Sequence, residues 1–253
     1  MKLKSILTVL FAAAVMQVSA QNAAPDQIKT NKGDLTIQPI QHATLVLTWE
    51  GKTIYVDPTG GAEAFEGMAK PDLILITDIH GDHMDVKTLD ALQAETAAMI
   101  VPQAVANELP MQHKSHTKIL GNGESTTALG IPITAVPMYN LPESADAMHT
   151  KGRGNGYVLR FGNKNVYISG DTEGVPEVRN LKNIDVAFLS MNLPYTMDVE
   201  QAASTTLDFK PKVIYPYHYR GQNGLSNVAA FKKMVNDKYK NIEVRLRDWY
   251  PAK

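Results

Sequence analysis

Short runs of apolar residues separated by polar turns recur along the whole chain, and their spacing predicts alternating strands and helices. The run 73–76 predicts a short buried strand. Residues 86–92 carry apolar side chains at helical spacing, and Asp85 stands where a helix cap is expected. In the first half, further strands are predicted at residues 36–38, 44–48, 53–56, 98–101 and 131–136, with a strand and turn over 118–127 and a short helix at 103–108.

The second half of the chain repeats this scheme. Residues 156–161 and 166–169 predict a hairpin, and buried strands at 186–190 and 213–215, helices at 199–207 and 227–238, and a strand at 243–246 follow. Hairpins and helices in both halves predict the α/β class, as an αββα sandwich of two mixed β-sheets with helices on the outer faces. No low-complexity linker interrupts residues 21–253, so we expect one domain of two similar halves.

The N-terminus has a different composition. Lys2 and Lys4 precede an apolar run over residues 6–15, and the small residues Val18-Ser19-Ala20 follow it. This order is typical of a secretory signal peptide over residues 1–20, and the run is too short for a good membrane span. We therefore expect a periplasmic or secreted protein without a stable membrane anchor; the alternative is a retained N-terminal anchor.

Composition limits the chemistry. The chain has 253 residues, 44% of them hydrophobic, and a net charge of −1, which favours neither nucleic acid nor an anionic membrane as a partner. It contains no cysteine. A disulfide and a lipid-modified cysteine are thus excluded, and any metal site must be built without thiolates. A small-molecule substrate is expected, and the oligomeric state stays open.

Candidate metal ligands crowd the turn between the strand at 73–76 and the helix at 86–92. Asp78, His80, Asp82 and His83 lie within six residues, around Gly81. Two carboxylates and two imidazoles in one turn are typical of a metal site, although a polar turn capping a helix is the alternative. Three more candidates flank other strands, each with an ordinary structural explanation when taken alone: His149, Asp171 and His218.

The segment Asp78-Ile79-His80-Gly81-Asp82-His83 resembles the H-x-H-x-D-H signature of the metallo-β-lactamase superfamily, with aspartate in place of the first histidine. The similarity extends over most of residues 21–253. It includes Ser169-Gly170-Asp171-Thr172 and the stretch from Leu193 to Asp198. The pattern is similar to the branch that contains ascorbate-phosphate lactonases and bacterial metal-dependent hydrolases. The stretch from His80 to Leu89 is also similar to relatives of N-acylphosphatidylethanolamine phospholipase D.

The resemblance implies two divalent metal ions. Matching positions assign Asp78, His80 and His149 to the first ion, Asp82, His83 and His218 to the second, and Asp171 to both. Zinc or manganese is expected, with iron as a third candidate, because the Asp78 carboxylate is a harder ligand than imidazole. A hydroxide held by the two ions would attack the substrate, and Asp82 or Asp171 would carry a proton as catalytic residues.

The implied function is an exported metal-dependent hydrolase that cleaves a lactone, ester, amide or phosphodiester. The alternative is a non-catalytic metal- or ligand-binding protein on the same fold. Asp57 is expected to orient a histidine, and His42 either does the same or is a core histidine. The candidate substrate contacts are Tyr139, Asn192, Tyr195, Tyr219 and Arg220.

Overall fold

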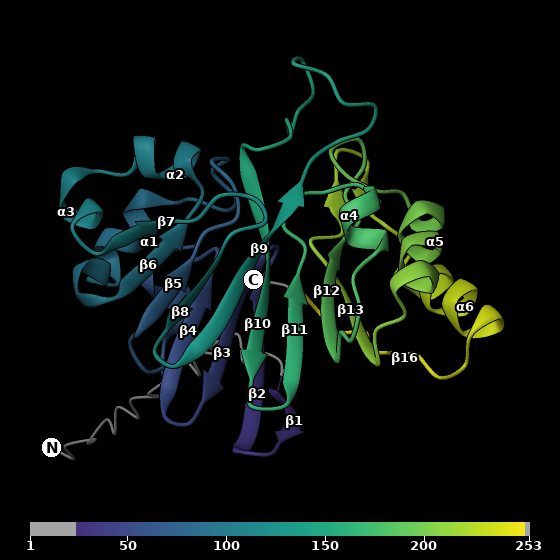
Figure 1. Ribbon diagram of the computed structural model, residues 1–253, viewed down its shortest axis with the longest axis horizontal. Helices are drawn as coiled ribbons and strands as arrows, with labels where there is room; N and C mark the ends of the chain where they lie inside the picture. Colours follow the sequence, from purple (N-terminus) through teal and green to yellow (C-terminus); the bar gives the residue numbers. More distant parts are fainter. Residues whose placement is uncertain (1–23, 251–253) are drawn as a thin grey trace, which may run out of the picture.

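Two seven-stranded sheets pack face to face in the structure, a computed structural model that describes residues 24–250 (Figure 1). In order, the first sheet contains β1 (Asp26–Thr30), β2 (Gly33–Gln41), β3 (Thr44–Trp49), β4 (Lys52–Val56), β5 (Leu73–Leu75), β6 (Ala98–Val101) and β7 (Thr117–Ile119). The second contains β16 (Glu243–Val244), β13 (Val213–Tyr217), β12 (Val186–Ser190), β11 (Lys164–Ile168), β10 (Gly154–Phe161), β9 (Ile131–Met138) and β8 (Ser125–Ala128). A separate two-stranded ribbon joins β14 (Arg220–Gly221) to β15 (Gly224–Leu225).

Both sheets are mixed. Strands β1 to β4 run antiparallel and β4 to β7 parallel. The second sheet repeats this arrangement, antiparallel from β8 to β11 and parallel through β12, β13 and β16. The predicted fold class is confirmed.

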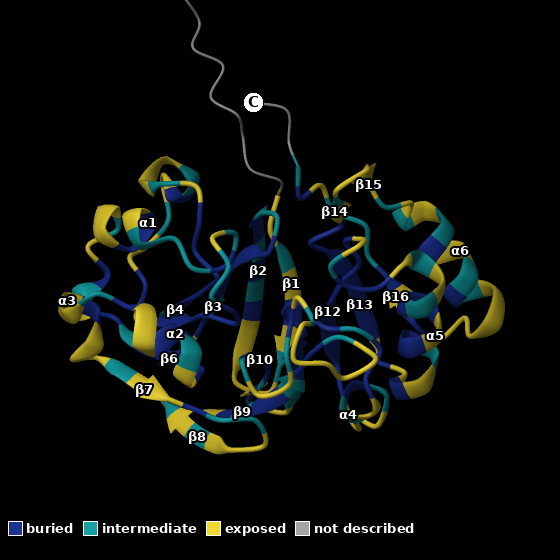
Figure 2. Cartoon of the chain, turned by 90° about the horizontal axis from the view of Figure 1, so that it is seen from above, coloured by how far each residue is buried: buried dark blue, intermediate teal, exposed yellow. Residues whose placement is uncertain are grey.

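Helices cover the outer face of each sheet (Figures 1 and 2). The first sheet carries α1 (Val86–Ala91), α2 (Gln103–Glu108) and α3 (Met111–Lys114), and the second carries α5 (Val199–Phe209) and α6 (Val228–Lys238), with α4 (Pro176–Arg179) beside α5. Short 3-10 helices occupy Ala62–Phe65 and Ala94–Thr96. No helix in residues 24–250 is long and apolar enough to span a membrane.

Side-chain alternation along the strands explains why the sheets have two buried faces. In β5, Leu73 and Leu75 belong to the core between the sheets, whereas Ile74 packs with Leu89 and Val105 under the helices of the first sheet. Successive side chains of a strand point to opposite faces, so a short run that is apolar throughout can fill both layers.

The predicted strands and helices are confirmed, with ends that differ by a few residues. Asp85 caps α1, because its carboxylate accepts the backbone N–H of Lys87. Strand β1, the β14–β15 ribbon and helices α3 and α4 were not predicted. The polar sequence of residues 112–116 predicts an exposed loop. This prediction is wrong at His113, whose side chain is fully buried, with Nε2 2.8 Å from Asp90 Oδ1. The predicted signal peptide, residues 1–20, lies outside the described residues.

The topology brings the candidate residues to one edge of the sandwich. Asp57, Asp171 and His218 each follow the carboxyl end of a strand, namely β4, β11 and β13. The turn at His42 lies between β2 and β3, and the register Leu45↔Val56 places it at the same edge as the end of β4.

Candidate metal centre

The turn after β5 presents its polar side chains at different depths. The backbone N–H groups of His83 and Met84 both donate to the carbonyl of His80, at 2.9 and 2.8 Å, which closes the turn. Asp78 and His83 are fully buried, whereas His80 and Asp82 are only half-buried. The turn therefore directs two ligand candidates inward and two toward the solvent.

The first group of ligand atoms comes from Asp78, His80 and His149. Asp78 Oδ2 lies 2.8 Å from His80 Nδ1 and 3.8 Å from His149 Nε2. Asp171 Oδ2 lies 3.3 Å from the same His149 nitrogen. These four residues are the ones that the superfamily resemblance assigns to the first metal.

The second group joins His83, His218 and Asp171. The two Nε2 atoms lie 3.2 Å apart, and His218 Nε2 is 3.2 Å from Asp171 Oδ1. His83 Nε2 lies 3.4 Å from Asp171 Oδ2. Asp171 thus borders both groups, the position in which a carboxylate can bridge two cations.

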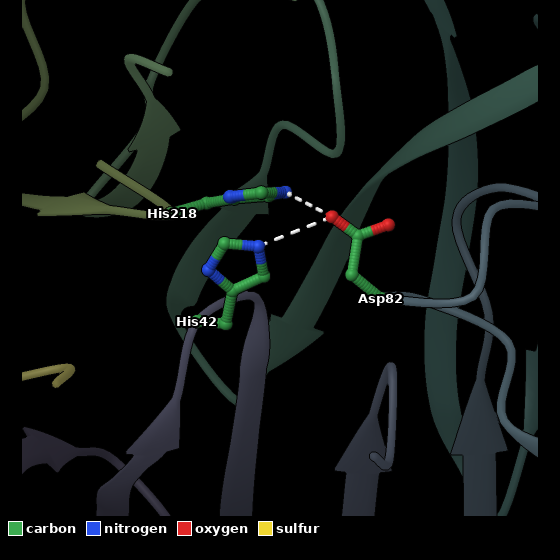
Figure 3. Close-up of side chains that lie close together, drawn as sticks. All are labelled: His42, Asp82 and His218. Carbon is green, nitrogen blue, oxygen red and sulfur yellow. Dashed lines mark hydrogen bonds and ion pairs between the residues drawn. The ribbon is translucent and has the colours of Figure 1, made fainter. Parts of the chain in front are cut away.

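Asp82 lies between two histidines, as Figure 3 shows. Its Oδ2 is 3.1 Å from His42 Nε2 and 3.4 Å from His218 Nε2. The other ring nitrogen of His42 lies 2.7 Å from the Tyr250 hydroxyl. The geometry therefore makes His42 a further candidate ligand beside the second group, in addition to the orienting role that its sequence position suggests.

The donor set fits divalent cations. Asn140 Oδ1 accepts the backbone N–H of His149 at 2.8 Å, so the His149 Nδ1 that lies 3.1 Å away must also be a donor. A neutral His149 then carries its lone pair on Nε2, which is buried without a hydrogen-bond partner. That lone pair faces the Asp78 and Asp171 oxygens. A cation between these atoms removes the repulsion between the Nε2 lone pair and the carboxylate oxygens. Nitrogen and oxygen donors without thiolates suit zinc or manganese.

Asp57 binds the Nδ1 side of the His83 ring, opposite the Nε2 atom that faces Asp171. Its Oδ2 lies 2.8 Å from His83 Nδ1, and Thr77 donates its backbone N–H and its hydroxyl to the two Asp57 oxygens at 2.7 and 2.6 Å. The imidazole is thereby oriented with Nε2 toward Asp171. Asp57, His42 and His218 all have left-handed backbone conformations, with φ of 45°, 50° and 46°. Such strain in non-glycine residues is concentrated at functional sites.

The carboxylates and imidazoles shift one another's proton affinity. Burial alone would lower the pKa of His83, but the nearby Asp171 and Asp57 carboxylates raise it well above its usual value. Burial alone would raise the pKa of Asp171, yet the His218 and His83 rings hold it well below the usual range. In the absence of a cation, the cluster thus keeps Asp171 ionised and His83 protonated.

Metal affinity is therefore expected to increase with pH. A proton and a cation compete for His83 Nε2, and the raised pKa keeps the proton bound to higher pH. Below that pKa the cation must displace the proton; above it there is no competition. Zinc affinity measured against a competing chelator from mildly acidic to mildly alkaline pH should rise, with proton release visible by calorimetry in different buffers. A pH-independent affinity would contradict this prediction.

A pocket of about 250 Å³ opens beside the first group and Asp171. It is lined by His80, Asp82, Met148, His149, Asp171, Asn192 and Tyr195. Two predicted substrate contacts, Asn192 and Tyr195, are therefore at the pocket. Three others lie outside this lining: Tyr139 donates its hydroxyl to Glu177, Tyr219 donates to the Arg247 carbonyl, and Arg220 stacks on the Tyr250 ring.

Three residues of the site were not found from the sequence. Asn140 orients His149, and Tyr250 contacts His42. Arg153 binds Asp78 through two hydrogen bonds, at 3.1 and 2.8 Å. Asn140 follows the end of β9, so the rule that polar residues at strand ends build the site could have found it. No sequence signal pairs Arg153 with Asp78.

Comparison with known proteins identifies the family. Residues 36–218 match the profile of the beta-lactamase superfamily domain. The chain belongs to the metallo-β-lactamase superfamily. It is 32% identical over 202 residues to a UPF0173 metal-dependent hydrolase of Thermococcus onnurineus, covering 74% of this chain and 86% of that protein. A UPF0173 metal-dependent hydrolase of Flavobacterium johnsoniae is 30% identical over 222 residues, with 79% and 92% covered.

Solved structures agree with this membership. A crystal structure from Parabacteroides distasonis, described as that of a candidate metal-dependent hydrolase, is 39% identical, with a TM-score of 0.79 and coverage of 90% of this chain and 99% of that one. A metallo hydrolase of Ignicoccus hospitalis, 24% identical with a TM-score of 0.71 and coverage of 87% and 96%, shares the fold. The chain is thus a metal-dependent hydrolase of the UPF0173 family, with a buried cluster of histidines and aspartates at its site.

Proposed function

We propose that the chain is an exported hydrolase whose two-metal centre cleaves a lactone, ester, amide or phosphodiester, with a preference for uncharged substrates. The observation that carries the two-metal assignment is Asp171, whose oxygens lie within 3.4 Å of His83, His149 and His218 and so border both ligand groups. Export to the periplasm or the medium is proposed from the signal-peptide pattern of residues 1–20.

A pair of bound cations would activate water and polarise the bond to be cleaved. The chain's own groups hold the substrate and the protons. Asp82 lines the pocket; burial alone would raise its pKa, but His218 and His42 lower it well below the usual range, so that it stays ionised. The lowered pKa suits Asp82 to hold a cation; as a weak base it would keep a proton only briefly before passing it to the leaving group. Asn192 and Tyr195 line the pocket where they can contact the substrate.

The experiment that tests this proposal measures metal content and turnover on the same protein. Purified mature chain, loaded with zinc or manganese, is assayed by mass spectrometry for metal and against a panel of lactone, ester, amide, phosphodiester and β-lactam substrates. We expect two metals per chain and turnover that a chelator abolishes and metal restores. Metal binding without turnover of any substrate would favour the binding-protein alternative.

The pocket favours an uncharged substrate over a phosphodiester. No lysine or arginine is among its lining residues in the described part of the chain. The basic side chains of the surrounding loops already have partners. Arg153 binds Asp78, Lys151 pairs with Glu143 and Glu177, and Arg220 stacks on Tyr250. An anionic substrate would therefore find only the metals to offset its charge.

One exposed apolar side chain lines the pocket, and another follows a lining residue in the sequence. Met148 lines the pocket and is 48% exposed, and Leu193 beside Asn192 is 47% exposed. The segment at Leu193 is tied to the β14–β15 ribbon, because Gln222 donates its backbone N–H to the Leu193 carbonyl at 2.9 Å. These positions suit an alkyl or aryl group attached to the scissile bond.

Replacing Met148 by serine is expected to raise the KM for esters with long alkyl chains by about tenfold, since partial burial of one such side chain contributes on the order of 1–2 kcal/mol. The KM for short-chain esters should hardly change. Met111→Ser is the matched control, because Met111 is 79% exposed and does not line the pocket. Equal effects on short and long chains would contradict the assignment.

A further inference from the structure

Asp78 stands where the superfamily signature has a histidine, and Arg153 binds it from a segment 75 residues away. The Arg153 Nε donates to Oδ1 at 3.1 Å and Nη2 donates to Oδ2 at 2.8 Å, a bidentate pair. The Asp78 side chain is fully buried and that of Arg153 is 19% exposed. A bidentate pair with so little exposure fixes both the charge and the orientation of the carboxylate.

The backbone is built around this pair. Asn155 donates its N–H to the Thr77 carbonyl at 2.9 Å, which joins the start of β10 to the segment that follows β5. A Cβ atom at Gly154 would lie 2.9 Å from the Thr77 carbonyl oxygen and 3.2 Å from Asp78 Oδ1. Glycine is therefore needed next to Arg153 for the two segments to come so close.

We propose that Arg153 is a positioning residue that allows an aspartate to serve at the first metal in place of histidine; the inference rests on the two-metal centre proposed above. The Asp78–Arg153 pair has no net charge, like the neutral imidazole for which it stands. Arg153 occupies Oδ1 and one lone pair of Oδ2. The remaining lone pair of Oδ2 is then available on the side of His80 Nδ1, 2.8 Å away, and His149 Nε2, 3.8 Å away.

Two consequences distinguish positioning from simple charge repulsion. Without Arg153, Asp78 loses both bonds that orient its oxygens, so metal affinity should fall although a positive charge has been removed. With histidine at position 78, Arg153 has no carboxylate to bind and its charge opposes the cations, so removing Arg153 should then raise the affinity. The sign of the Arg153 effect thus depends on the residue at position 78.

The test is a double-mutant cycle of the native chain, Asp78→His, Arg153→Gln and the double variant. Stepwise zinc affinities are measured by chelator competition, and metal content by mass spectrometry. In each single variant we expect one zinc-binding step to be at least tenfold weaker than in the native chain. In the double variant we expect that step to be at least tenfold stronger than in Asp78→His. Arg160→Gln, on the exposed side of β10, is the matched control and should bind zinc like the native chain.

An Arg153→Gln variant with native zinc affinity would overturn the proposal, as would an affinity that rises in both backgrounds. Arg153→Lys keeps the charge without the planar fork and should also bind zinc at least tenfold more weakly. If Arg153→Gln does not fold, Arg153→Lys tests the proposal in its place. Native zinc affinity in Arg153→Lys would then overturn the proposal. A native chain that binds two metals but turns over no substrate would defeat the proposed function, while the cycle would still decide the role of Arg153.

Discussion

Replacing Asp171 by asparagine is expected to reduce turnover by about a thousandfold or more and to leave fewer than two metals per chain. Asp171 is almost completely buried and is the one carboxylate that borders both ligand groups of the described site. The amide has nearly the same shape but no charge. It cannot offset two cations, and its NH₂ group would face imidazole nitrogens or the metals.

The measurement is kcat together with metal content for Asp171→Asn and for a matched control. Asp34→Asn serves as that control, because Asp34 is exposed in β2 near the turn with β1, at the end of the strand away from His42. The control should retain native turnover and two metals. If Asp171→Asn kept two metals and more than about a tenth of native turnover, the bridging role would be wrong, since such a role requires the charge.

Replacing Trp249 by alanine is expected to lower the free energy of unfolding by about 3–5 kcal/mol, the usual cost of removing a large buried aromatic ring. Trp249 has no exposed surface, and its ring centroid lies 5.6 Å from that of Tyr217 and 6.2 Å from that of Phe188. Its carbonyl accepts the backbone N–H of His42 at 3.1 Å. The ring thus joins the C-terminal segment to the second sheet, while the backbone carbonyl joins it to the turn at His42.

Urea unfolding should be measured with chelator present, because metal binding would add its own stabilisation. Tyr239→Ala is the control, since Tyr239 is 38% exposed, and it should change the free energy of unfolding by less than about 1 kcal/mol. A loss below about 1 kcal/mol for Trp249→Ala would show that the cavity collapses or that the ring is not packed as described.

The strands and most helices could be predicted because their signals are local. Strand β3 contains Leu45 and Leu47 on the side of the inter-sheet core and Val46 on the helix side, and such alternation is visible in adjacent residues. Strand β1 could not be predicted, because Ile28 is its one buried residue. It pairs with β2 from Asp26↔Ile37 to Thr30↔Gly33, and the Tyr215 hydroxyl donates to Asp26 at 2.9 Å, contacts that no local pattern encodes.

The candidate ligands could also be found from the sequence, since carboxylates and imidazoles at strand ends are costly unless they bind something. His113 shows the limit of that reasoning. Its neighbours in the sequence are polar, yet His113 is the buried residue of α3, and Asp90 of α1 provides its partner. Burial of a single polar residue depends on the elements that pack against it, and these come from other parts of the chain.

The sequence alone determined two sheets, most of the helices that cover them, and the residue types gathered at one edge, because periodicity and strand ends are properties of neighbouring residues. Only the tertiary structure decided how those residues are held. Asp57 was expected to orient a histidine, but which ring nitrogen faces it follows from packing. The Asp78–Arg153 pair joins the segment after β5 of the first sheet to the start of β10 of the second, and such a pairing exists only once the chain has folded.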